Sequence, residues 1–244
     1  MKKRLLVLGL AFTMLAATAC GTSSDDGNKT SKADKTVTAT SNNDKTSETQ
    51  KNDDKKDDAK ESYKSADDIT MDDLKNHEET SAEDFEYADG PDGSVVIEGY
   101  IGDDPIVVIP NEIDGKKVVD FKKIFQNNKN VVAIKVGDNV EEIADSAFSN
   151  CENLKYLILG KNVKKFNDTI VGGKKLEQLE LNEGLEELGT GSSSIGVNII
   201  GDVDVKIPES VKQMNFSCKK TMIVKAGSSA EAYAKENNMD YRVE

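Results

Sequence analysis

The chain has 244 residues, of which 36% are hydrophobic, with no tryptophan and a formal net charge of −13. This charge repels a phosphate backbone, and no basic stripe is interleaved with aromatic residues, so we expect no binding to nucleic acid. The three cysteines, Cys20, Cys151 and Cys218, form no Cys-x-x-Cys pair, so neither a disulfide framework nor a zinc site is indicated.

Residues 1–19 have the pattern of an export signal. Lys2-Lys3-Arg4 precedes a mainly apolar run from Leu5 to Leu15, and small residues follow from Ala16. The apolar run is shorter than the roughly 20 residues that a membrane-spanning helix needs. We therefore predict a cleaved leader.

The end of the leader resembles the lipobox of bacterial lipoproteins, in the sequence Ala17-Thr18-Ala19-Cys20-Gly21. The resemblance implies cleavage before Cys20, diacylglycerol on its thiol, and an extracytoplasmic protein anchored to a bacterial membrane. Two or three acyl chains hold firmly because each buried CH₂ contributes about 0.8 kcal/mol. The alternative is an ordinary secretory signal whose cysteine is incidental.

Residues 20–83 are mostly Asp, Lys, Ser, Thr and Asn. Their few large apolar residues are Val37, Tyr63, Ile69, Met71 and Leu74. Such a segment buries too little apolar surface to offset the entropy of ordering it, so we predict a disordered acidic tether. A weak helix around residues 66–74 is the only structure that the pattern allows. The aspartates form no calcium-binding loop of the EF-hand type.

Residues 84–105 are predicted to form a hairpin that caps the folded part. Two short β-prone runs, Phe85–Tyr87 and Val95–Ile97, flank the turn sequence Asp89-Gly-Pro-Asp-Gly93. Such a cap would cover the open end of a repeat structure.

Residues 106–226 contain a repeat with apolar residues at offsets 0, 2, 6 and 9. Three copies start at 134, 157 and 179, which are 23 and 22 residues apart. A period in the twenties indicates a leucine-rich solenoid. Extending the alignment gives six strand anchors, each followed two residues later by another apolar residue: Val107, Ile134, Leu157, Leu179, Val205 and Met222.

Alternation of this kind puts each apolar pair on one face of a strand, and parallel stacking of the strands would bury that face. Between strands, Phe148, Cys151 and Leu154 are spaced by three, which predicts a short helical turn on the opposite side of each coil. Cys151 is expected to be a small buried hydrophobe.

Residues 227–244 are predicted to form a helix–strand cap at the other end. Ser228 and Glu231 suit a capping box, and Ala230, Tyr233 and Ala234 form an apolar stripe. Residues 239–243 then alternate as a final strand.

Several of these motifs resemble the BspA-type leucine-rich repeats of bacterial surface proteins: Ile-Pro at 109–110 and 207–208, Ala147-Phe148-x-x-Cys151-x-x-Leu154, Val140-Glu-Glu-Ile143, and the closing segment 227–237. The resemblance implies an extracytoplasmic solenoid, mostly β with short helical turns, of a kind tied to adhesion or host contact. Residues 166–200 depart from this pattern, because glycine and serine replace the Phe and Cys of the loop turn.

The sequence offers little for catalysis, and we expect no catalytic residue, metal site or cofactor. The only histidine, His77, precedes the predicted fold, so a Ser/His or Cys/His nucleophile has no base there. The carboxylate pairs Glu141-Glu142 and Glu186-Glu187 fall on solvent-facing positions. A carboxylate-based hydrolase is the remote alternative.

The outward positions of the predicted sheet are the candidate binding face: Ile106, Val108, Lys135, Tyr156, Ile158, Gln178, Glu180, Lys206 and Ile223. Several are larger and more apolar than a solvated face requires, and clustered exposed apolar residues mark interaction surfaces. The alternatives are that single exposed apolar residues are ordinary on strands, or that a flanking segment covers them. The favoured function is therefore a non-enzymatic module that binds a protein or a glycan; the alternative is a structural or accessory envelope lipoprotein without a dedicated ligand.

Overall fold

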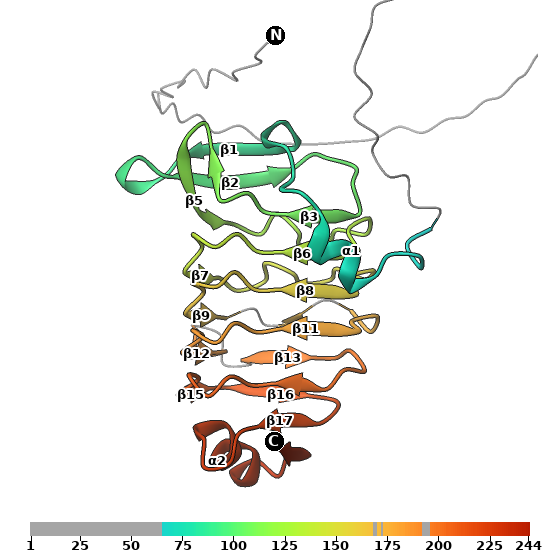
Figure 1. Cartoon of the computed structure of the whole chain (residues 1–244), viewed down its shortest axis with the longest axis vertical. Coiled ribbons are helices and arrows are strands. Elements are labelled where there is room, and N and C mark those ends of the chain that lie inside the picture. Colours follow the sequence, from blue (N-terminus) through green and yellow to red (C-terminus); the bar gives the residue numbers. More distant parts are fainter. Residues whose placement is uncertain (1–64, 168–169, 172, 192–195) are drawn as a thin grey trace, which may run out of the picture. The chain divides into compact units, whose positions relative to one another are not determined.

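A computed structural model describes residues 65–244, apart from 168–169, 172 and 192–195. The predicted leader, Cys20 and the tether as far as residue 64 lie outside the described residues. The repeats form the predicted solenoid, in which short strands recur at the same place in successive coils (Figure 1).

The first side of the solenoid is a parallel sheet of four strands, in the order β11-β8-β6-β3. These strands are β3 (Ile106–Val108), β6 (Ala133–Lys135), β8 (Tyr156–Ile158) and β11 (Gln178–Glu180). Their central residues, Val107, Ile134, Leu157 and Leu179, lie side by side in one register and are buried. The predicted stacking of adjacent coils is therefore confirmed.

The ladder of the first side is interrupted after β11 and resumes in a separate parallel sheet. This sheet has the order β14-β17-β18 and consists of β14 (Val205–Lys206), β17 (Met222–Val224) and β18 (Tyr241–Val243). The anchors Val205 and Met222 pair as predicted.

The second side is a parallel sheet of four two-residue strands from successive coils. It contains β7 (Glu142–Ile143), β9 (Lys165–Phe166), β12 (Glu187–Leu188) and β15 (Gln213–Met214). Its apolar members Ile143, Phe166 and Leu188 are buried, which explains the apolar residue at offset 9 of each repeat.

The third side changes character along the solenoid. The segment from Phe148 to Leu154 forms successive turns, with backbone hydrogen bonds spaced by three residues, in place of the predicted helical turn. In later coils, where the Phe-x-x-Cys-x-x-Leu spacing of residues 148–154 does not recur, a third parallel sheet takes this place: β10 (Ile170–Val171), β13 (Val197–Ile199) and β16 (Phe216–Cys218).

A row of phenylalanines fills the interior. The ring of Phe148 lies 5.8 Å from Phe121, 6.1 Å from Phe125 and 6.3 Å from Phe166, measured between centroids. Cys151 is fully buried beside them and its thiol donates to the carbonyl oxygen of Phe125 at 2.8 Å. Aromatic pairs at these separations add stability beyond the area that they bury.

Two of the repeats also share Gly and Asn at the same offsets, as Gly137 with Asn139 and Gly160 with Asn162, and this has a structural cause. A Cβ atom on Gly160 would lie 2.3 Å from the carbonyl oxygen of Gly137, so the backbones of adjacent coils approach too closely for a side chain. The amide nitrogens of Asn139 and Asn162 donate to the carbonyl oxygens of Asn111 and Asp138, in the preceding coils. These bonds connect each turn to the backbone of the preceding coil.

Both ends of the solenoid are covered. At the first end, β1 (Phe85–Asp89) and β2 (Val95–Tyr100) form the predicted antiparallel hairpin, joined in one sheet by β5 (Lys116–Phe121) and β4 (Glu112–Ile113). Short 3₁₀ turns lie at Ala82–Asp84 and Pro91–Gly93. At the other end, α2 (Ser229–Glu236) precedes β18, and the Ser228 side chain accepts from the amide of Glu231 as predicted.

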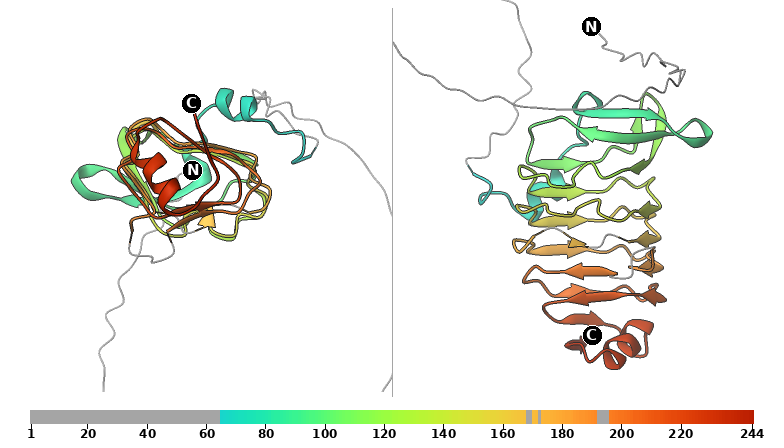
Figure 2. Two further views of the ribbon diagram at one scale, coloured as in Figure 1. Left: turned by 90° about the horizontal axis from the view of Figure 1, so that it is seen from below. Right: turned by 180° about the vertical axis from the view of Figure 1, so that it is seen from behind.

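The prediction of a disordered tether is wrong for residues 65–83. Residues 65–80, here called the strap, contain the helix α1 (Met71–Asn76) and lie on the outside of the coil (Figure 2). Ile69, Met71 and Leu74 are buried, so this stretch does bury enough apolar surface to be ordered. Within the described part of the chain, no helix combines the length and apolar character needed to cross a membrane.

Candidate functional site

The candidate site is the outer face of the first side, where side chains alternate with the buried anchors. Two columns point outward. The first runs through Ile106, Ala133, Tyr156, Gln178, Asp204 and Thr221, and the second through Val108, Lys135, Ile158, Glu180, Lys206 and Ile223. The structure divides this face into two halves with different surroundings.

The covered half lies on β3, β6 and β8, beneath the strap. Its outward residues Ile106, Val108, Ala133 and Tyr156 pack with Ile69, Met71 and Leu74 of the strap in one apolar cluster, and Ile158 is half-buried against it. Ile106 is 0% and Tyr156 7% exposed. The flanking-segment alternative is therefore correct for these positions, and Ile106, Val108 and Tyr156 are not accessible as the binding-face prediction required.

The end of the strap pairs with the free edge of β3. The amide of Thr80 donates to the carbonyl oxygen of Val108 at 2.9 Å, and the amide of Val108 donates to the Thr80 hydroxyl at 3.0 Å. The next residue back, Glu79, accepts from the backbone and side-chain amides of Asn111. These bonds satisfy an edge strand that would otherwise present unpaired backbone groups.

Ion pairs fix the two ends of the helical part of the strap. Lys155, whose side chain is 9% exposed, lies 2.9 Å from the Asp67 carboxylate, and Lys75 lies 2.6 Å from Glu180. The hydrogen bond from Lys155 and its charge lower the pKa of Asp67, and the bond to Asp67 raises the pKa of Lys155. An acidic group before the helix and a basic group in its last turn therefore meet opposite charges on the sheet.

Tyr156 contacts both the strap's apolar cluster and the charged residues at its edge. Its hydroxyl donates to Glu177 at 2.8 Å. Burial, together with that hydrogen bond to a carboxylate, raises the pKa of Tyr156 to about 12. The phenol is thus held neutral, with its ring among apolar groups and its oxygen at the edge.

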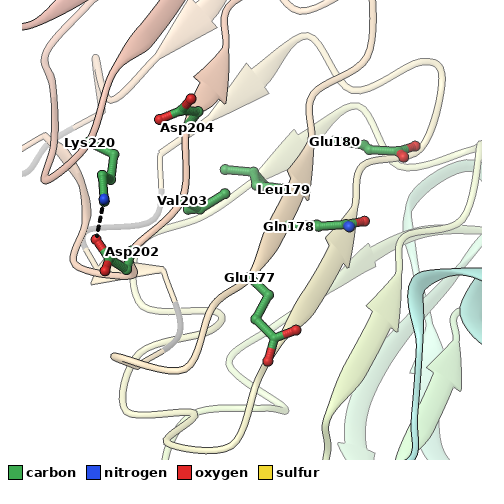
Figure 3. A pocket seen from close by; sticks show the side chains of 8 residues that line it. All are labelled: Glu177, Gln178, Leu179, Glu180, Asp202, Val203, Asp204 and Lys220. Carbon is green, nitrogen blue, oxygen red and sulfur yellow. Dashed lines mark ion pairs between the residues drawn. The ribbon is translucent and has the colours of Figure 1, made fainter.

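The open half lies on β11, β14 and β17, beyond the reach of the strap's apolar residues. Gln178, Glu180 and Lys206 are exposed and Ile223 is half-buried. Where the ladder is interrupted between β11 and β14, the surface is hollowed by about 540 Å³ (Figure 3). The lining residues are Glu177, Gln178, Leu179, Glu180, Asp202, Val203, Asp204 and Lys220.

The carboxylates of this hollow already have partners. Glu177 accepts from Tyr156, Glu180 pairs with Lys75, and Asp202 lies 3.4 Å from Lys220 and 3.5 Å from Lys219. Asp204 accepts from the amide of Thr221 and lies 4.0 Å from Arg242. Among the described residues, no group of three His, Cys, Asp or Glu side chains is placed to hold a metal ion. The hollow is therefore a polar, charge-paired surface.

The other residues that carry reactive groups are engaged in the fold. Cys151 is buried, and its thiol donates a hydrogen bond to the carbonyl oxygen of Phe125. Burial raises the pKa of Cys218 to about 11, so its thiol is protonated at neutral pH. Of the paired carboxylates, Glu141 lies 3.5 Å from Lys164 and Glu187 lies 3.2 Å from Lys165.

The predicted binding residues are thus on one face but not in one environment. Ile106, Val108 and Tyr156 lie under the strap, Lys135 and Ile158 are half-buried, and Gln178, Glu180, Lys206 and Ile223 line or flank the open half. Cys20 lies outside the described residues.

Sequence reasoning gave only a weak helix around residues 66–74 and missed the docking of the strap on the sheet, although a signal for an ordered helix was present. Thr70 and Asp73 form a capping box, in which each accepts a hydrogen bond from the other's backbone amide. Ile69 and Leu74 occupy the two positions of a hydrophobic staple around it. Both signals precede a helix of only six residues and were obscured by the polar composition around them.

Comparison with known proteins identifies the repeats. Residues 121–218 match the BspA type leucine rich repeat region in six copies. These residues are thus leucine-rich repeats of the BspA type, and the repeat family supports a protein-interaction or adhesion-type module.

The chain is similar to a solved structure, the crystal structure of the T. pallidum leucine rich repeat protein (TpLRR). The identity is 22%, with 67% of this chain and 81% of that chain covered and a TM-score of 0.47. No curated protein matches the sequence.

Proposed function

We propose that this protein is a non-enzymatic, lipid-anchored module held outside a bacterial membrane, and that the open half of its sheet face binds a protein partner. The observation that carries the proposal is the division of the face: outside the apolar cover of the strap, Gln178, Glu180 and Lys206 are exposed and Ile223 is half-buried on the strands β11, β14 and β17, beside a hollow of about 540 Å³. Residues positioned by stacked strands present a surface of fixed geometry.

The chemistry of this half favours a protein over a glycan. Its outward residues Gln178, Glu180, Asp204, Lys206, Thr221 and Ile223 include both charges, amide and hydroxyl groups and one aliphatic side chain, but no aromatic ring on which a sugar could stack. A mixed polar surface with a small apolar centre is typical of transient protein interfaces.

The test is site-specific photo-crosslinking in intact cells. A photoreactive residue at Gln178 should crosslink to a discrete envelope protein. The matched control is Gln213, an exposed glutamine on β15 of the second side. The same crosslinked products from both positions, or none from either, would favour the alternative of a structural spacer without a ligand.

The lipid anchor is tested separately by metabolic labelling with an alkyne fatty acid. The wild-type chain should be labelled and recovered with membranes, and Cys20→Ser should abolish both. Cys218→Ser is the matched control, because it removes a half-buried cysteine of the solenoid and should leave the label unchanged. Labelling that persists in Cys20→Ser would contradict lipidation at this residue.

A further inference from the structure

The strap is packed as a separate unit on the solenoid. The residues of its apolar cluster, among them Ile69, Met71, Leu74, Ile106 and Tyr156, share no member with the cluster that fills the coils. The interior of the solenoid is therefore complete without the strap. The strap covers the apolar outer surface of β3, β6 and β8.

The strap makes its contacts in the manner of a short peptide ligand. Three apolar side chains, at Ile69, Met71 and Leu74, enter the sheet face, and the charged residues Asp67 and Lys75 bind opposite charges at either end. Amphipathic segments that dock in apolar grooves use anchors of this kind for affinity and flanking charges for orientation.

The strap is also poorly suited to hold its shape when undocked. Its helix has six residues, far below the roughly 12 to 15 that an isolated helix needs in water, so it folds only as it docks. Its capping box and staple reduce the cost of that step. Short segments with few buried contacts open locally at a lower free energy than the whole fold.

We propose that the covered half is a peptide-binding face and that the strap is its intramolecular ligand, which a segment of another protein can replace. The replacing segment has the strap's chemistry: an acidic residue, then three apolar residues at the spacing of Ile69, Met71 and Leu74, then a basic residue. This site is distinct from the open half and does not depend on the function proposed above.

The experiment measures binding of a fluorescein-labelled peptide of residues 65–80 to the full-length chain by fluorescence anisotropy. The triple variant Ile69→Ser, Met71→Ser, Leu74→Ser empties the face and should bind the peptide saturably. The wild type should bind at least about tenfold more weakly, because its own strap occupies the site. A peptide with Asp67→Lys and Lys75→Glu should bind the triple variant about tenfold more weakly than the native peptide.

The matched control is the double variant Asp72→Ser, Glu78→Ser, which changes exposed strap residues and should behave as the wild type. A triple variant with native circular dichroism that does not bind the peptide would overturn the proposal, as would equal binding by the wild type. If the triple variant does not fold, Leu74→Ser alone replaces it, and an affinity no higher than that of the wild type would overturn the proposal.

Discussion

The covered and open halves of the sheet face occupy equivalent positions of one repeat but carry different residues. Under the strap the outward columns hold Ile106, Val108, Ala133 and Tyr156, whereas beyond it they hold Gln178, Glu180, Asp204 and Lys206. Apart from Lys135 and Ile223, outward side chains are therefore apolar where the strap covers the sheet and polar where water reaches it. An outward position in a solenoid is thus not defined by the repeat alone, because a segment from outside the repeat decides which part of the face is solvated.

The largest effect should come from the interior, which both halves share. Phe148→Ala removes a fully buried ring from the row of phenylalanines and should lower the free energy of unfolding by about 3 to 5 kcal/mol. Urea denaturation followed by circular dichroism gives this value. Both halves should be lost in the same transition; loss of the covered half alone would contradict the shared interior.

Leu74→Ala should destabilise the covered half without affecting the open half. It leaves a cavity beneath the strap and should weaken docking of the strap by about 2 kcal/mol or more, while the coils keep their stability because Leu74 belongs to the separate cluster. Hydrogen exchange of the Val108 amide, which donates to Thr80, should accelerate. Equal acceleration in β12 and β15 would show that the strap supports the whole solenoid.

Thr70→Ala should have a smaller effect of the same kind. It removes the side chain that caps α1 and should weaken docking of the strap by about 1 kcal/mol. Exchange of the amides in residues 71–76 measures it. Thr70→Ser keeps the hydroxyl and serves as the control, so equal protection in the Ser and Ala variants would contradict a capping role.

The smallest effect should be the pH dependence of strap docking through Asp67. Because Lys155 lowers the pKa of Asp67 below its ordinary value of 3.8, this carboxylate contributes stability that is present above that value and is lost as the pH falls through the lowered one. Methyl NMR signals of Leu74, followed from about pH 5 to pH 2, should report a loosening strap. In Asp67→Asn this contribution is absent, and an unchanged pH profile would contradict the role of Asp67.

Much of the solenoid could be predicted from the sequence, because its physical requirements recur. Gly160 is needed because the backbones of adjacent coils are in close contact, and the side chains of Asn139 and Asn162 donate to carbonyl oxygens of the preceding coil. The apolar pairs mark the strands. The strands β10, β13 and β16 were not predictable, since the spacing of Phe148, Cys151 and Leu154 that marks the third side in an earlier coil does not recur there. On the sheet face, the repeat pattern places the Tyr156 side chain outward but does not show whether another segment covers it. Its burial depends on Ile69, Met71 and Leu74, three apolar residues in a polar stretch more than 80 positions earlier.

The pairing of Thr80 with Val108 also has a mechanical consequence. Tension applied to the chain before Ser65 reaches the strap first, and passes to the hairpin and the coils only after the two hydrogen bonds between Thr80 and β3 have parted. The strap is therefore the first described segment to bear a load applied from the N-terminal side. Release of the strap under such a load would lengthen the N-terminal segment and expose the outward apolar residues of β3, β6 and β8, while the coils stayed stacked.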